Sequence, residues 1–121
     1  MAKLLIAVKS ESLGTDLAKT LTQHEVYSCR TGTDALPLLE TLQPDVFVVE
    51  LSLPVISGLT VLQEAHYKPP MMLALTNLIS ESVLQAAAEA GVQDILLLPC
   101  AIQSVIAHLE FLIQKVPAPD A

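Results

Sequence analysis

Short apolar runs and amphipathic segments alternate along this chain. The runs are rich in Val, Ile and Leu, and a run that apolar is typical of a strand that is covered on both faces of a parallel sheet. The predicted strands are Lys3–Val8, Glu25–Arg30, Val46–Val49, Met71–Thr76 and Asp94–Leu98. The second run alternates more between apolar and polar residues, which favours a place nearer the edge of the sheet. The third is closed by a single carboxylate, Glu50.

The segments that follow these runs carry apolar residues at the spacing of one helix face. The predicted N-caps of the first four helices are Ser10, Thr33, Ser57 and either Ser80 or Ser82. The third helix is expected to end near Tyr67, and Gly91 is placed to end the fourth in a left-handed conformation. The fifth helix is predicted over Ala101–Lys115. Pro37 fits the second helix only within its first turn, where a missing N–H costs least.

This alternation of strands and helices, joined by short loops, predicts an α/β domain with right-handed crossovers. The domain is expected to span residues 1–115, and the sequence VPAPDA at 116–121 is expected to be a linker or a disordered tail. In such folds the functional crevice lies at the carboxyl ends of the strands. Glu50 is therefore expected in that crevice.

Composition narrows the function. The chain has 121 residues, and its formal charge of −7 comes from thirteen acids against six scattered bases. Direct binding to nucleic acid or to an anionic membrane needs clustered cations, so neither is expected. No apolar run approaches the ~20 residues that span a bilayer, and the start lacks a signal peptide, so a cytoplasmic protein is expected. The two cysteines have no metal-ligand spacing, and the three histidines fall in separate segments.

One stretch carries a family resemblance. In PDVFVVELSLPVISGLTVL, residues 44–62, Pro54 follows Glu50 by four positions and Gly58 follows it by eight. These offsets, together with the later AGVQDILLLP segment, resemble the receiver domain of two-component response regulators. The resemblance implies a flavodoxin-like (βα)5 fold, a doubly wound parallel sheet with strand order 2-1-3-4-5.

The resemblance also marks departures at the metal site. Receivers hold Mg²⁺ with an acidic pair after the first strand, where this chain has Lys9 and Ser10, followed by Glu11. Glu50 stands in place of the phospho-accepting aspartate and is one methylene longer. An ammonium removes an oxygen ligand and repels a cation, so no cofactor and no Mg²⁺ are expected. Two interpretations of Glu50 stay open: an ion pair with Lys9 across adjacent strand ends, or a solvated strand-end carboxylate.

Three further positions belong to the signalling apparatus of the resembled family. Thr76 retains the hydroxyl that ends the fourth strand, Ile95 replaces the switch aromatic, and Leu98 replaces the lysine that contacts the phosphoryl group. Thr76 also suits a strand end as a β-branched residue, and the other two also suit simple packing. Of the phosphorylation apparatus, only Thr76 is unaltered.

These departures predict a pseudo-receiver. We expect a non-enzymatic protein interaction module that works without phosphorylation and regulates an effector domain. By resemblance, its partner or homodimer contacts are expected on the fourth helix, fifth strand and fifth helix, over 82–90, 94–98 and 101–115. One alternative is a genuine receiver that is phosphorylated at Glu50 or Ser10. Another is a flavodoxin-like ligand-binding domain, although no Gly-rich phosphate loop follows the first strand.

Overall fold

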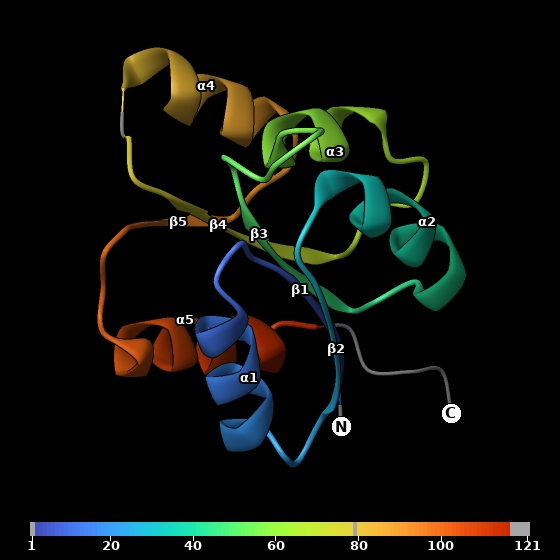
Figure 1. Cartoon of the computed structure of the whole chain (residues 1–121), viewed down its shortest axis with the longest axis vertical. Coiled ribbons are helices and arrows are strands. Elements are labelled where there is room, and N and C mark those ends of the chain that lie inside the picture. The colour runs from blue at the N-terminus through green and yellow to red at the C-terminus, as the bar shows by residue number, and fades with distance from the viewer. Residues whose placement is uncertain (1, 79, 117–121) are drawn as a thin grey trace.

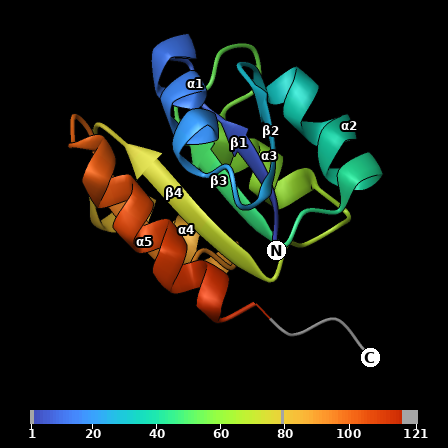
Figure 2. The ribbon, with the colours of Figure 1, turned by 90° about the horizontal axis from the view of Figure 1, so that it is seen from below.

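The computed structural model describes residues 2–78 and 80–116 of the chain. Its sheet is parallel with the order β2-β1-β3-β4-β5, which confirms the predicted topology. The strands are β1 (Lys3–Ala7), β2 (Glu25–Cys29), β3 (Val46–Glu50), β4 (Met71–Thr76) and β5 (Asp94–Leu97). The helices are α1 (Glu11–Thr20), α2 (Gly32–Leu42), α3 (Gly58–Glu64), α4 (Glu81–Glu89) and α5 (Ile102–Gln114). Helices α1 and α5 cover one face of the sheet, and α2, α3 and α4 cover the other (Figures 1 and 2).

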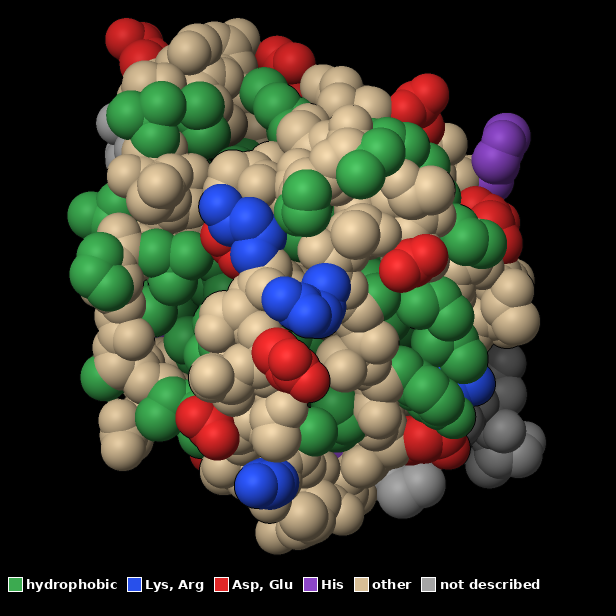
Figure 3. Space-filling model, in the orientation of Figure 1, with side chains coloured by type: hydrophobic (Ala, Val, Ile, Leu, Met, Phe, Trp, Pro, Cys, Tyr) green, Lys and Arg blue, Asp and Glu red, His purple; other side chains and the backbone are tan. Residues whose placement is uncertain are grey.

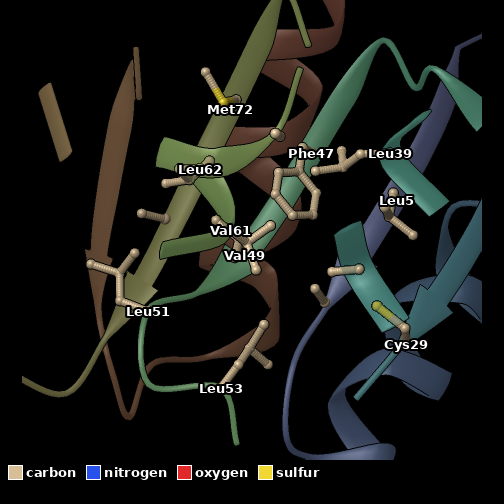
Figure 4. Close-up of a cluster of buried hydrophobic side chains, with 14 residues drawn as sticks. Leu5, Cys29, Leu39, Phe47, Val49, Leu51, Leu53, Val61, Leu62 and Met72 are labelled. Atoms are coloured by element: carbon tan, nitrogen blue, oxygen red, sulfur yellow. The ribbon is translucent and has the colours of Figure 1, made fainter. Parts of the chain in front are cut away.

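The sheet separates two aliphatic clusters. Every residue of β3 is buried, which agrees with a central strand that is covered on both faces. Phe47 lies in the cluster under α2 and α3, where Leu39, Val61 and Leu62 surround it (Figure 4). The second cluster lies under α1 and α5 and includes Leu17. The helices are thus held by apolar burial on both faces of β3.

The side-chain caps at Ser10, Ser57 and Ser80 are confirmed, since each accepts a backbone N–H from the first turn of its helix. The prediction for α2 was wrong. Its cap is Thr31, whose Oγ1 accepts the Asp34 N–H at 3.1 Å, and the helix begins at Gly32. Pro37 therefore lies inside α2, beyond its first turn.

Several element ends also differ from the prediction. Helix α3 stops at Glu64 because Glu40 Oε1 accepts the N–H groups of His66 and Tyr67, at 2.9 and 3.0 Å, and holds them in a loop. Strand β5 ends at Leu97, and the Leu98 N–H still donates to the Thr76 carbonyl at 2.7 Å.

Gly91 ends α4 with a φ of +99°, as predicted. Val116 packs against the second cluster, and the rest of the predicted tail, 117–121, lies outside the described residues. In the part of the chain that is described, no helix is both long enough and apolar enough to cross a bilayer.

Candidate functional site

The carboxyl ends of β1 and β3 bring Lys9 and Glu50 together. The two strands are neighbours in register, with Ala7 opposite Val49, so the residues that follow them meet at one edge of the sheet. Lys9 Nζ lies 3.5 Å from Glu50 Oε2, and the Lys9 backbone N–H donates to Glu50 Oε1 at 3.0 Å. The structure therefore shows the ion pair that was one of the two interpretations of Glu50.

The burial of Glu50 does not fit the other interpretation, a solvated carboxylate. Its side chain is only 9 % exposed, while that of Lys9 is 46 % exposed. The Ser52 hydroxyl donates to Glu50 Oε2 at 3.4 Å, so both carboxylate oxygens have partners. Attraction between the charges is offset by the cost of desolvating Glu50, and half-exposed pairs of this kind are worth about 1 kcal/mol or less.

The loop between β1 and α1 carries a second acid, Glu11, which pairs elsewhere. Arg30 Nη1 lies 3.7 Å from Glu11 Oε2, and Arg30 Nε donates to the Lys9 carbonyl at 3.3 Å. Ser10 uses its hydroxyl as the cap of α1, accepting the Leu13 N–H at 3.2 Å. Arg30 thus contacts both the main chain of Lys9 and the carboxylate of Glu11.

Thr76 is buried at the end of β4, and its hydroxyl serves its own loop. Thr76 Oγ1 donates to the Leu78 carbonyl at 3.1 Å and accepts the Leu78 N–H at 3.2 Å. Ile95 packs against the cluster under α2 and α3, and Leu98 packs against the cluster under α1 and α5. Of the predicted positions, the structure gathers Lys9, Ser10, Glu50 and Leu98 around one pocket and leaves Thr76 and Ile95 outside its lining.

This edge pocket has a volume of about 580 Å³. Its lining consists of Lys9, Ser10, Leu13, Glu50, Asn77, Leu98, Pro99 and Cys100. The sequence analysis did not predict that Asn77, Pro99 and Cys100 line a pocket. Each of them nevertheless follows the end of β4 or β5, where the crevice of a parallel sheet is expected. Figure 3 shows hydrophobic side chains over the β5–α5 loop, beside a basic group that lies against an acidic one.

The two thiols occupy different surroundings. Burial raises the pKa of Cys29 to about 11, and the nearby Asp34 carboxylate acts in the same direction. Cys100 is partly buried in the wall of the edge pocket. The two cysteines therefore lie at separate sites.

Outside the edge pocket, sequence reasoning missed a side-chain pair. His108 Nδ1 on α5 contacts Asp94 Oδ2 at the start of β5, and both side chains are partly buried. The two residues are fourteen positions apart, so no local pattern reveals the pair.

Comparison with known proteins adds the family. The profile of the response regulator receiver domain matches residues 10–110. Protein-glutamate methylesterase/protein-glutamine glutaminase 3 of Rhodospirillum rubrum is 30 % identical over 93 residues, covering 74 % of this chain and 25 % of that protein. Response regulator MprA of Mycobacterium tuberculosis is 26 % identical over 102 residues, covering 81 % of this chain and 44 % of MprA. This chain therefore spans less than half the length of either relative.

Solved structures agree on the fold. The non-phosphorylated HemR receiver domain of Leptospira biflexa matches with a TM-score of 0.83 at 22 % identity, and each chain is covered completely, at 100 %. The chemotaxis protein CheY4 of Vibrio cholerae matches with a TM-score of 0.79 at 25 % identity, covering 97 % of this chain and 99 % of CheY4. The sheet order and the match over residues 10–110 agree, and the chain belongs to the response regulator receiver domain family.

Proposed function

We propose that this domain is a pseudo-receiver, a receiver that transmits a signal through protein contacts without aspartyl phosphorylation. One observation carries the proposal: the Lys9 ammonium lies 3.5 Å from the carboxylate of Glu50, the residue that by resemblance stands in place of the phospho-accepting aspartate. A phosphoryl group and its metal would have to displace that ammonium. The chain thus supplies from its own sequence the cation that would otherwise come from solution.

The side chains at this edge do not fit Mg²⁺, which requires several oxygen ligands in near-octahedral geometry. Glu50 is the one carboxylate in the pocket lining, and its oxygens already accept bonds from Lys9 and Ser52. Glu11 is paired with Arg30. Within residues 2–78 and 80–116, no group of three or more His, Cys, Asp or Glu side chains is placed to hold a metal ion.

The remaining phosphorylation apparatus supports the same proposal. A transferred phosphoryl group needs charged donors at its oxygens, and Leu98 offers none. The Thr76 hydroxyl is occupied by the backbone of Leu78. Glu50 paired with Lys9 would hold the domain in one signalling state, which a partner recognises constitutively.

The partner surface that we propose is formed by α4, β5 and α5. Large apolar side chains are exposed on each of these elements: Leu84 is 40 % exposed, Leu97 51 % and Phe111 59 %. Exposed apolar groups on three adjacent elements favour a protein interface over a purely solvated face. A second copy of the domain is the occupant that we propose, and an effector domain is the output that it would regulate.

Beryllofluoride with Mg²⁺, and separately acetyl phosphate with Mg²⁺, test the proposal. We expect no adduct in the intact mass spectrum and no shift of the Glu50 neighbourhood in ¹H–¹⁵N spectra. The matched control is the quadruple variant Lys9→Asp/Ser10→Asp/Glu50→Asp/Leu98→Lys, which rebuilds the acidic pair, the acceptor aspartate and the phosphate-contacting lysine and should respond to both reagents. A stoichiometric adduct on the wild-type chain, at Glu50 or Ser10, would show a genuine phosphorylatable receiver instead.

A further inference from the structure

The edge pocket combines a charged side with an apolar wall. Its volume of about 580 Å³ lies within the range of about 300–1,000 Å³ that is typical of small-molecule sites. One wall is apolar and consists of Leu13, Leu98, Pro99 and Cys100. It also lies at the carboxyl edge of a doubly wound sheet, where such folds bind ligands.

The charged side of the pocket consists of Lys9 and Glu50, and its Lys9 ammonium is accessible to a ligand. Glu50 is almost fully buried, and its oxygens accept from the Lys9 N–H and the Ser52 hydroxyl. Lys9 keeps nearly half of its side chain exposed, and its ammonium has three donors. Among the described acids, Glu50 is the one that lies within 4.0 Å of that ammonium. The group left for a ligand is therefore positive.

The side-chain donors of the lining are few, which argues against some ligand classes. A nucleotide or an inorganic phosphate needs several donors around its phosphate oxygens, and besides Lys9 the side chains of the lining offer only the Ser10 hydroxyl and the Asn77 amide. A purely apolar molecule would leave the exposed donors of Lys9 without a new partner. A molecule with an apolar body and one anionic end satisfies both walls.

We propose that the edge pocket binds a small amphipathic organic anion, with its carboxylate on the Lys9 ammonium and its apolar body against Leu13 and Leu98. The inference rests on the proposed function, because a bound Mg²⁺ would take the place of the Lys9 ammonium. Binding at this edge would give the domain a chemical input where other receivers take a phosphoryl group. The ligand would also cover Cys100, whose thiol lines the same pocket.

Octanoate is the probe, and octanol and octylamine are its neutral and cationic counterparts. We expect octanoate to bind saturably by calorimetry and to slow the alkylation of Cys100 by iodoacetamide. Octanol should bind about fivefold more weakly, the factor expected from one half-exposed ion pair, and octylamine more weakly still. Cys29 is an internal control, because its burial should leave it unlabelled throughout.

Variants of Lys9 and of Glu50 should change the affinity for octanoate in opposite directions. Lys9→Met should remove the preference for octanoate over octanol, and Lys9→Arg should restore it. Glu50→Gln keeps an acceptor for the Lys9 N–H but frees the ammonium, so it should tighten octanoate binding by about fivefold. Lys19→Met, on the exposed last turn of α1, is the matched control and should leave binding unchanged.

The proposal is overturned if octanoate fails to protect Cys100, or if Lys9→Met and Glu50→Gln leave the preference for octanoate as it is in the wild-type chain. Either result leaves the proposed function intact, because that depends on the absence of a beryllofluoride or phosphoryl adduct. An adduct on the wild-type chain would refute the proposed function through a different measurement. The two failures are thus separable.

Discussion

At the scale of single residues, the Lys9 ammonium compensates a carboxylate that the fold buries. Lys9→Met removes the ammonium but leaves the backbone N–H bond to Glu50 in place. We expect the free energy of unfolding to fall by about 1–2 kcal/mol, measured by urea denaturation, because a buried charge loses its counter-ion. Adding Glu50→Gln should recover part of that loss. An unchanged stability in Lys9→Met would show that the pair is incidental.

The thiol of Cys29 gives a residue-level prediction in pH. Its pKa is raised from 9.0 to about 11 in the folded state, so folding favours the protonated thiol. The stability that this contributes is complete below the ordinary pKa and is lost as pH rises through about 11. The Cys29→Ala variant lacks this thiol. The free energy of unfolding of the wild-type chain, taken relative to that of the variant, should therefore decrease between about pH 8 and pH 10.5. If urea denaturation gives the same difference in free energy of unfolding at every pH in this range, that result would contradict a raised pKa of the Cys29 thiol in the folded state.

At the scale of elements, local sequence patterns predicted the features that depend only on residues close in sequence, such as helix caps. Ser57 caps α3 as expected, because its hydroxyl needs only the next turn. Thr31 and Thr33 look equivalent in sequence, and what separates them is tertiary: a Cβ at Gly32 would lie 2.0 Å from the Ile56 carbonyl oxygen. Topology placed Lys9 and Glu50 at neighbouring strand ends, which left the ion pair as one of two interpretations of Glu50. The apolar wall of the pocket did not follow from topology, because it depends on how the β5–α5 loop packs.

Two helix glycines give opposite predictions. A Cβ at Gly58 would lie 2.2 Å from the Glu50 carbonyl oxygen and 2.8 Å from Val49 Cγ2, so Gly58→Ala must push α3 away from β3. We expect a loss of about 3 kcal/mol in the free energy of unfolding. Gly14→Ala is the matched control, because its nearest neighbour would be Val8 Cγ2 at 3.6 Å, and it should gain about 0.5–1 kcal/mol. Equal melting temperatures for the two variants would refute the packing argument.

At the scale of the whole molecule, the Lys9–Glu50 pair and the proposed interface belong to different strands of one sheet. The Lys9–Glu50 pair ties β1 to β3, while the Thr76 hydroxyl bonds with the backbone of Leu78 just after β4. Neither arrangement needs a phosphoryl group. Both sets of bonds are made within the chain itself, and on this we base the expectation of a constitutive surface.

That surface predicts self-association through α4, β5 and α5. The purified chain should show a concentration-dependent dimer by light scattering after size exclusion. Leu97→Glu and Phe111→Glu should each weaken dimerisation by at least about tenfold, because each buries a charge against an apolar partner surface. Val55→Glu is the matched control, since Val55 is 84 % exposed on the β3–α3 loop, outside the proposed interface. A chain that stays monomeric at high concentration, or a dimer that is indifferent to Leu97→Glu and Phe111→Glu, would leave these exposed side chains to a different partner and refute self-association.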